Sequence, residues 1–124
     1  MEYSNSFNRF FLIARETFSH LKGRTFLDTK ETIKDCYWGF DSSDGEYACI
    51  IMEIEDRELK FSFKQESNEY VSIFNSHTPH KSIELEMDDD YMSIQEEIVY
   101  YIATVLNQNA PRNYDLFTRY GFEK

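Results

Sequence analysis

The chain has few of the residues that mark a disulfide-bonded, repetitive or membrane-spanning protein. It has two cysteines, Cys36 and Cys49, too few for the disulfide scaffold of a small secreted domain. Four glycines and two prolines leave little room for a linker, a repeat or a low-complexity tract. There is no run of roughly 18 apolar residues and no secretion-type N-terminal segment. We therefore expect one soluble, cytoplasmic domain over residues 1–124.

Aromatic residues are abundant instead. Eleven Phe, nine Tyr and one Trp make up 17% of the chain, which excludes a disordered protein because disordered chains are poor in these residues. A small core does not require this much aromatic surface. Some of it is therefore expected at a partner interface, where Tyr and Trp are enriched.

The negative charge is concentrated in the middle of the chain. Residues 41–97 hold sixteen acidic and four basic residues, whereas residues 1–40 and 98–124 each carry a net charge of +1. The total of −10 repels nucleic-acid phosphates and anionic membranes and attracts basic proteins. We therefore expect no direct binding of nucleic acid or membrane, and a basic protein as partner.

The pattern of apolar residues predicts an α+β fold. Helical spacing from Ser6 to Lys22 is followed by Gly23 as a stop, and alternation with a period of two then continues to Met87. The predicted strands are 32–40, 46–55, 58–64, 70–75 and 82–87. The predicted architecture is a two-layer sandwich: a five-stranded antiparallel meander with an N-terminal and a C-terminal helix packed on one face, in the order α-β-β-β-β-β-α-α.

Pairing neighbouring strands as hairpins tests this alternation. With turns at Asp41–Gly45 and at Asp56-Arg57, all core candidates, Cys36, Trp38 and Phe40 included, fall on one face. The predicted cross-strand neighbours are Trp38 with Ala48, Met52 with Phe61, Phe63 with Val71, and Val71 with Met87. The same register places Cys36 and Cys49 on opposite faces, so no bond between them is expected.

The second long helix is predicted to begin at Ser93. Ser93 and Glu96 have the spacing of a capping box, directly after Asp88, Asp89 and Asp90. Its apolar stripe is Ile94, Ile98, Tyr101, Ile102 and Val105, and the helix is expected to end near residues 107–109. A short helical turn follows, with Asn113 as its cap and Gly121 as its stop.

No standard catalytic or metal-binding constellation is visible. His77 and His80 form the one histidine pair, but Pro79 lies between them and no further ligand is adjacent. Neither cysteine has a nearby base, and no phosphate loop or nucleophile elbow occurs. We therefore expect no metal, no cofactor and no enzymatic activity, an enzyme of unfamiliar type being the remaining alternative.

The sheet face turned away from the helices is the candidate interaction site, because it mixes aromatic rings with acids. The predicted partner-binding residues are Tyr37, Tyr47, Glu53, Glu55, Tyr70, Phe74, Glu84, Glu86, Asp88, Asp89 and Asp90. Aromatic anchors ringed by carboxylates suit the arginines of a basic protein. Two alternatives stay open: the face pairs with itself in a homodimer, or the tail residues Leu116, Phe117, Tyr120 and Phe122 cover it.

These observations predict a binding module, not a catalyst. Small acidic α+β chains occur among bacterial immunity proteins, antitoxins, phage-encoded inhibitors and secretion chaperones, and this chain shares their architecture without a shared motif. The leading hypothesis is an inhibitor that masks a basic, nucleic-acid-handling protein by steric and electrostatic blocking. A homodimeric chaperone or adaptor is the alternative.

Overall fold

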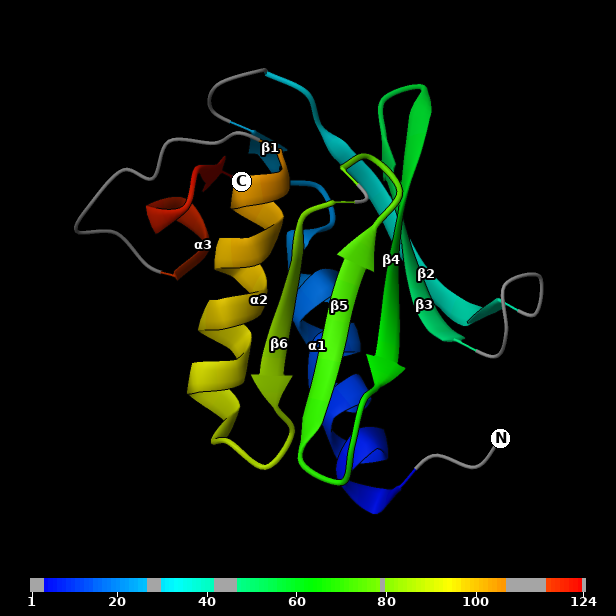
Figure 1. The fold of residues 1–124 in the computed structure, drawn as a ribbon. Helices are drawn as coiled ribbons and strands as arrows, with labels where there is room; N and C mark the ends of the chain where they lie inside the picture. Colours follow the sequence, from blue (N-terminus) through cyan, green and yellow to red (C-terminus); the bar gives the residue numbers. More distant parts are fainter. Residues whose placement is uncertain (1–3, 27–29, 42–46, 79, 107–115, 124) are drawn as a thin grey trace.

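The computed structural model describes residues 4–26, 30–41, 47–78, 80–106 and 116–123 (Figure 1). The elements in chain order are α1 (Asn5–Leu21), β1 (Thr25–Phe26), β2 (Ile33–Asp41), β3 (Tyr47–Ile54), β4 (Arg57–Gln65), β5 (Tyr70–Asn75), β6 (Ser82–Glu86), α2 (Tyr91–Val105), α3 (Leu116–Arg119) and β7 (Phe122–Glu123). Most of the predicted turn at Asp41–Gly45, the predicted cap Asn113 and Pro79 lie outside the described residues.

Five strands form one antiparallel sheet in the order β2-β3-β4-β5-β6, and α1 and α2 pack together on one face of it (Figure 1). The predicted two-layer α+β architecture is confirmed. The two-residue strands β1 and β7 were not predicted, and they pair with each other in a small second sheet. Strands this short carry too little alternation to stand out in a sequence.

Helix α1 forms because its apolar residues share one stripe and both of its ends are satisfied. The Ser4 side chain accepts a hydrogen bond from the Phe7 backbone N–H at 3.1 Å, which caps the first turn. Gly23 follows the last turn with φ of +80°, a conformation that glycine adopts without strain. Phe10 and Phe18 are at most 1% exposed and meet Phe63 of β4 edge-on.

Helix α2 begins two residues earlier than predicted, so the proposed capping box is wrong. Asp90 is the N-cap: its carboxylate accepts hydrogen bonds from the Ser93 backbone N–H and hydroxyl, both at 2.9 Å. A carboxylate at this position also interacts favourably with the helix dipole, which a serine hydroxyl does less well. The predicted apolar stripe from Ile94 to Val105 is buried as expected, and the helix ends at Val105.

The cross-strand register differs from the predicted one by two residues in every hairpin. The observed neighbours are Trp38 with Ile50, Met52 with Leu59, Phe63 with Ile73, and Val71 with Leu85. The turn between β3 and β4 is Glu55-Asp56 and not Asp56-Arg57, and Glu55 has φ of +51°. A shift by an even number of residues leaves each side chain on its original face, so the predicted faces are correct although the predicted pairs are not.

Two predicted core residues of β2 are not buried. Trp38 and Phe40 are 50% and 60% exposed, although they lie on the same side of β2 as the buried Cys36. Strand β2 is at the edge of the sheet, and α1 covers only part of its inner side (Figure 1). Alternation specifies a face of a strand, whereas burial also needs a covering element.

The described part of the C-terminal tail packs on the helical side of the sandwich and does not cover the outer sheet face. Arg24 is 8% exposed, donates a hydrogen bond to the Phe122 carbonyl at 3.2 Å and stacks over the Phe117 ring at 4.6 Å. Phe122 is fully buried in the core. The alternative that residues 116–123 cover the tyrosine-rich face is therefore wrong.

Candidate functional site

The outer face of the sheet is the side turned away from α1 and α2, and it holds most of the predicted site. Pairing across the strands places these side chains on it: Tyr37, Tyr47, Ile51, Glu53, Glu58, Lys60, Ser62, Tyr70, Ser72, Phe74, Glu84 and Glu86. Tyr37 and Tyr70 are 42% and 38% exposed, which leaves much of each ring open to a partner.

Tyr47 and Phe74 form an aromatic bridge near the centre of this face. They come from β3 and β5, on either side of β4, and their ring centroids are 5.6 Å apart in an edge-on arrangement. Ser62 of β4 pairs with Phe74 on one side and Cys49 on the other, and it is 4% exposed. The bridge therefore shields a short stretch of the outer face, and Tyr47 and Phe74 are half-buried.

Tyr37 lies in the middle of the edge strand β2, beside an acidic row. Asp35, Glu53 and Glu58 are neighbours across β2, β3 and β4, which brings like charges together. The Tyr37 hydroxyl donates a hydrogen bond to Glu58, and this bond raises the pKa of Tyr37 to about 12. A hydrogen bond from Lys22 at 3.0 Å lowers the pKa of Asp35.

Tyr70 lies at the opposite end, beside the acids of β6. Tyr70 pairs with Glu86, and Ser72 pairs with Glu84. Within the described part of the chain, neither glutamate carboxylate has a hydrogen bond or an ion pair. Three inter-strand steps of about 4.8 Å separate β2 from β5, so Tyr37 and Tyr70 are at least ~14 Å apart. The outer face thus offers two separate anchors instead of the one cluster that the sequence suggested.

The remaining predicted residues lie off the outer face. Glu55 is in the β3–β4 turn, where its carboxylate accepts a hydrogen bond from the Thr32 backbone N–H at 2.9 Å. Asp88, Asp89 and Asp90 are exposed in the β6–α2 loop at one end of the sandwich (Figure 1). The Ser93 backbone N–H and hydroxyl lower the pKa of Asp90, so this carboxylate has a structural role as a helix cap.

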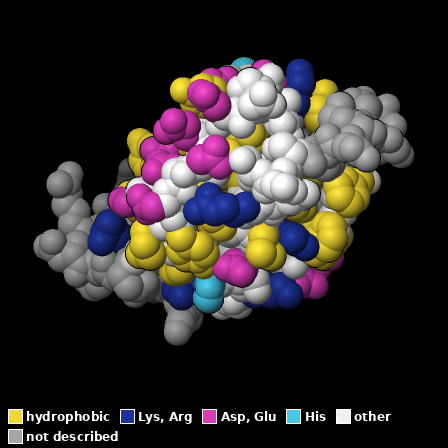
Figure 2. Space-filling view, turned by 90° about the horizontal axis from the view of Figure 1, so that it is seen from below, with side chains coloured by type: hydrophobic (Ala, Val, Ile, Leu, Met, Phe, Trp, Pro, Cys, Tyr) yellow, Lys and Arg dark blue, Asp and Glu magenta, His cyan; other side chains and the backbone are white. Residues whose placement is uncertain are grey.

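Acidic and hydrophobic side chains gather in different places at that end of the molecule. Figure 2 shows it from below, with acidic groups clustered at the upper left and hydrophobic groups at the lower left and the right. A second acidic surface lies between α2 and the tail, in a hollow of about 220 Å³ lined by Ser93, Glu96, Glu97, Tyr100 and Tyr120. Negative charge therefore extends beyond the sheet face.

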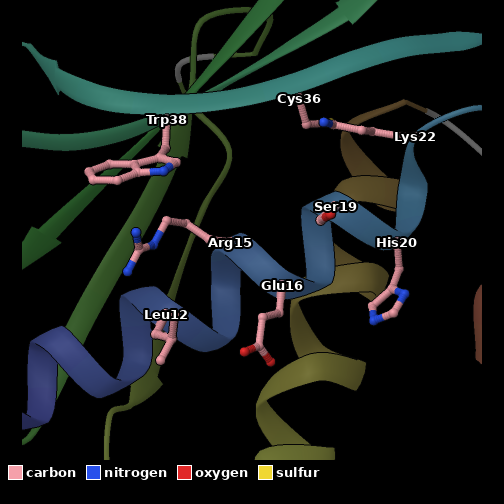
Figure 3. Close-up of a pocket in the computed structure, with 8 residues that line it drawn as sticks. All are labelled: Leu12, Arg15, Glu16, Ser19, His20, Lys22, Cys36 and Trp38. Carbon is pink, nitrogen blue, oxygen red and sulfur yellow. The ribbon is translucent and has the colours of Figure 1, made fainter.

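The sequence did not predict a groove between α1 and β2. It has a volume of about 390 Å³ and is lined by Leu12, Arg15, Glu16, Ser19, His20, Lys22, Cys36 and Trp38 (Figure 3). Two aromatic residues, Trp38 and Phe40, could have signalled it. They lie on a strand that the predicted meander places at the edge of the sheet, where a helix need not cover them. Leu12, also 47% exposed, extends the apolar surface onto α1.

The Arg15 side chain in the groove stacks on aromatic rings and has a buried donor without a partner. Its guanidinium carbon lies 4.3 Å from the centroid of the Trp38 ring and 5.3 Å from that of Phe11, a cation–π geometry that contributes roughly 0.5–2 kcal/mol. Its Nε is buried and has no hydrogen-bond partner in the described part of the chain. A buried donor in that state costs about 1–3 kcal/mol. The unsatisfied donor therefore costs about as much as the stacking contributes, or more.

The chemistry available to the cysteines and to metal ions is limited. Cys36 and Cys49 are buried and not disulfide-bonded. Burial raises the pKa of Cys36 to about 12, which leaves almost no thiolate at neutral pH. Among the described residues, no three His, Cys, Asp or Glu side chains are grouped closely enough to hold a metal ion. None of the described helices has the length and apolar character needed to cross a membrane.

Comparison of the chain with models of protein families, with characterised proteins and with solved structures finds no match.

Proposed function

We propose that the protein is a small acidic binding module that inhibits a basic protein by covering its cationic surface. The observation that carries this proposal is the outer face of the sheet, where Tyr37 and Tyr70 remain exposed beside acidic side chains. Aromatic rings and carboxylates together match arginine, whose guanidinium stacks on a ring while its N–H groups pair with an acid.

The proposed mechanism is electrostatic steering followed by steric blocking. The charge of −10 attracts a cationic partner over a distance, and the free carboxylates Glu84 and Glu86 pair with it at contact. Tyr70 then supplies apolar area beside them. A partner that handles nucleic acid would be inhibited because the acidic outer face covers the cationic site at which the partner binds phosphates. The unlinked cysteines suit action in the reducing cytoplasm.

A homodimeric chaperone or adaptor is the second candidate. Ile51 and Phe74 are half-buried on the same outer face and would add apolar area if two copies met there. Acidic rows on both copies would repel each other, so this assembly should strengthen as salt is added. Binding of a basic partner should weaken under the same conditions.

The test is affinity capture from extracts of the native cell with the tagged chain and two variants of equal charge. Glu84→Gln/Glu86→Gln removes two carboxylates from the outer face, whereas Asp56→Asn/Glu97→Gln removes two exposed carboxylates elsewhere. We expect a basic protein that the first variant binds roughly five- to tenfold more weakly and the second nearly as well as the wild type.

Salt dependence separates the two candidates. The association rate with the captured protein should fall as ionic strength rises, because screening at about 0.15 M limits attraction to ~8 Å. Capture of an acidic partner, or equal binding by both variants, would contradict the proposal. If sedimentation shows that the fraction of dimer rises with salt, the homodimeric adaptor is supported instead.

A further inference from the structure

The groove between α1 and β2 differs in charge from the rest of the acidic surface. Three of its ionisable side chains already have contacts: the Glu16 carboxylate accepts from the Tyr91 hydroxyl, Lys22 pairs with Asp35, and the His20 ring lies against Phe117. In Figure 3, Glu16 and His20 point away from the strand, whereas the Arg15 guanidinium lies beneath the Trp38 ring.

Arg15 is therefore the cation of the groove without an acidic partner. Within the described part of the chain its side chain has no hydrogen bond or ion pair, and it contacts the rings of Trp38 and Phe11. Its Nε is buried without a hydrogen-bond partner, so the donors left for another molecule are its terminal nitrogens. A guanidinium held on an indole in this way can donate hydrogen bonds to a carboxylate of another molecule.

The backbone of β2 is open to a partner beyond its first residue. Ile33 is already hydrogen-bonded to Gly23 and Arg24, whereas Trp38 pairs with β3 alone. No strand other than β3 pairs with β2 among the described residues of the five-stranded sheet. The Cys36 N–H points to this side of β2, where the side chain of Asp35 already accepts its hydrogen bond at 2.8 Å. Alternation in an antiparallel ladder directs the backbone N–H and C=O groups of Trp38 to the same side.

We propose that this edge binds an extended acidic segment of a partner protein. The segment adds to β2 as a further strand, places one carboxylate on Arg15 and rests apolar side chains on Trp38 and Leu12. Charge complementarity selects the occupant, because an acidic segment matches Arg15, the cation among the described groove residues that has no ion pair. This site is separate from the outer face and does not depend on the function proposed for it.

The test selects binders of the full-length chain from a phage-displayed library of random short peptides. We expect the selected peptides to share an Asp or Glu at one position. Because Trp38 is the one tryptophan of the chain, titration of a synthetic consensus peptide can be followed by its emission. Replacing the shared acid of the peptide with its amide should weaken binding to the wild-type protein roughly ten- to a hundredfold.

Protein variants provide a second, independent comparison. Arg15→Met keeps an unbranched side chain over Trp38 but removes the charge, and it should lose the same ten- to a hundredfold. Lys64→Met removes an exposed cation from the outer face of the sheet, and this variant should bind the peptide as tightly as the wild type. The proposal fails if the peptides share no acid, if the amide peptide binds equally well, or if sedimentation shows that a second copy of the chain occupies β2.

Discussion

Replacing Asn75 with alanine should destabilise the protein more than any other single change to a polar side chain of the sheet. Asn75 is 3% exposed and fixes the β5–β6 connection to α2. Its amide nitrogen donates to the Tyr101 hydroxyl at 2.7 Å and to the Lys81 carbonyl at 3.3 Å. Its amide oxygen accepts from the backbone N–H and the hydroxyl of Thr78, at 2.6 and 3.1 Å.

The expected cost follows from these contacts. Each of the four hydrogen bonds contributes about 0.5–1.5 kcal/mol. Because they share two amide atoms and do not add in full, losing all of them should lower the free energy of unfolding by about 2–4 kcal/mol. Tyr101→Phe removes fewer bonds: the donation from Asn75 and the 2.8 Å bond from the hydroxyl to Lys81. The Lys81 carbonyl keeps its contact with Asn75 in that variant, so the loss should be about 1–2 kcal/mol.

Urea denaturation followed by circular dichroism measures both losses. With a slope of about 2 kcal/mol per M, Asn75→Ala should lower the midpoint by about 1–2 M. The double variant should cost about 1 kcal/mol less than the sum, because the two residues share one bond. Thr104→Ala, which removes an exposed hydrogen bond on the same helix, is the control and should change stability by less than about 0.5 kcal/mol. A loss below about 1 kcal/mol for Asn75→Ala would refute the reasoning, because removing a buried amide with four hydrogen bonds should lower the free energy of unfolding by more than that.

Three further predictions concern the core, a thiol and a phenol. Phe63→Ala should cost about 3–5 kcal/mol because Phe63 is fully buried, whereas Phe40→Ala should cost under about 1 kcal/mol, and thermal or urea melts compare the two. Cys36 should react with a disulfide reagent at about pH 8 more than a thousandfold more slowly than the unfolded chain, because its pKa of about 12 suppresses the thiolate; fast labelling would show that the thiol is accessible. The Tyr37–Glu58 hydrogen bond should stabilise the protein below the ordinary tyrosine pKa of about 10 and lose this effect as pH rises through about 12, so Tyr37→Phe should flatten the alkaline melting curve; an unchanged alkaline slope would count against the bond.

The faces of the strands could be predicted from the sequence, but their register could not. Alternation between Ile50, Met52 and Ile54 assigns a side to each residue and is unaffected by a shift of two. Register depends on where the turn lies, and at Glu55 the chain adopts a positive φ that no glycine or asparagine signals. The backbone conformation at the turn therefore sets the register, which the alternation of apolar residues does not specify.

The candidate site was predicted in part for a related reason. Tyr70 and Glu86 were correctly placed on one face, because that placement also needs only alternation. The separation of Tyr37 from Tyr70 and the stacking of Arg15 on Trp38 depend on tertiary arrangement. Arg15 is in a helix and Trp38 in a strand, and no local sequence pattern specifies how these two elements cross. The groove between them could therefore not be predicted from the sequence.

The position of Trp38 also determines how unfolding experiments on this protein should be read. The indole sits at the rim of the fold, so its emission reports release of the stacked guanidinium and not loss of the phenylalanine-rich interior. If the edge strand loosens first, the fluorescence curve will precede the circular dichroism curve. Such non-coincident transitions are usually taken as a sign of a populated intermediate. Here they would reflect local fraying around a single chromophore.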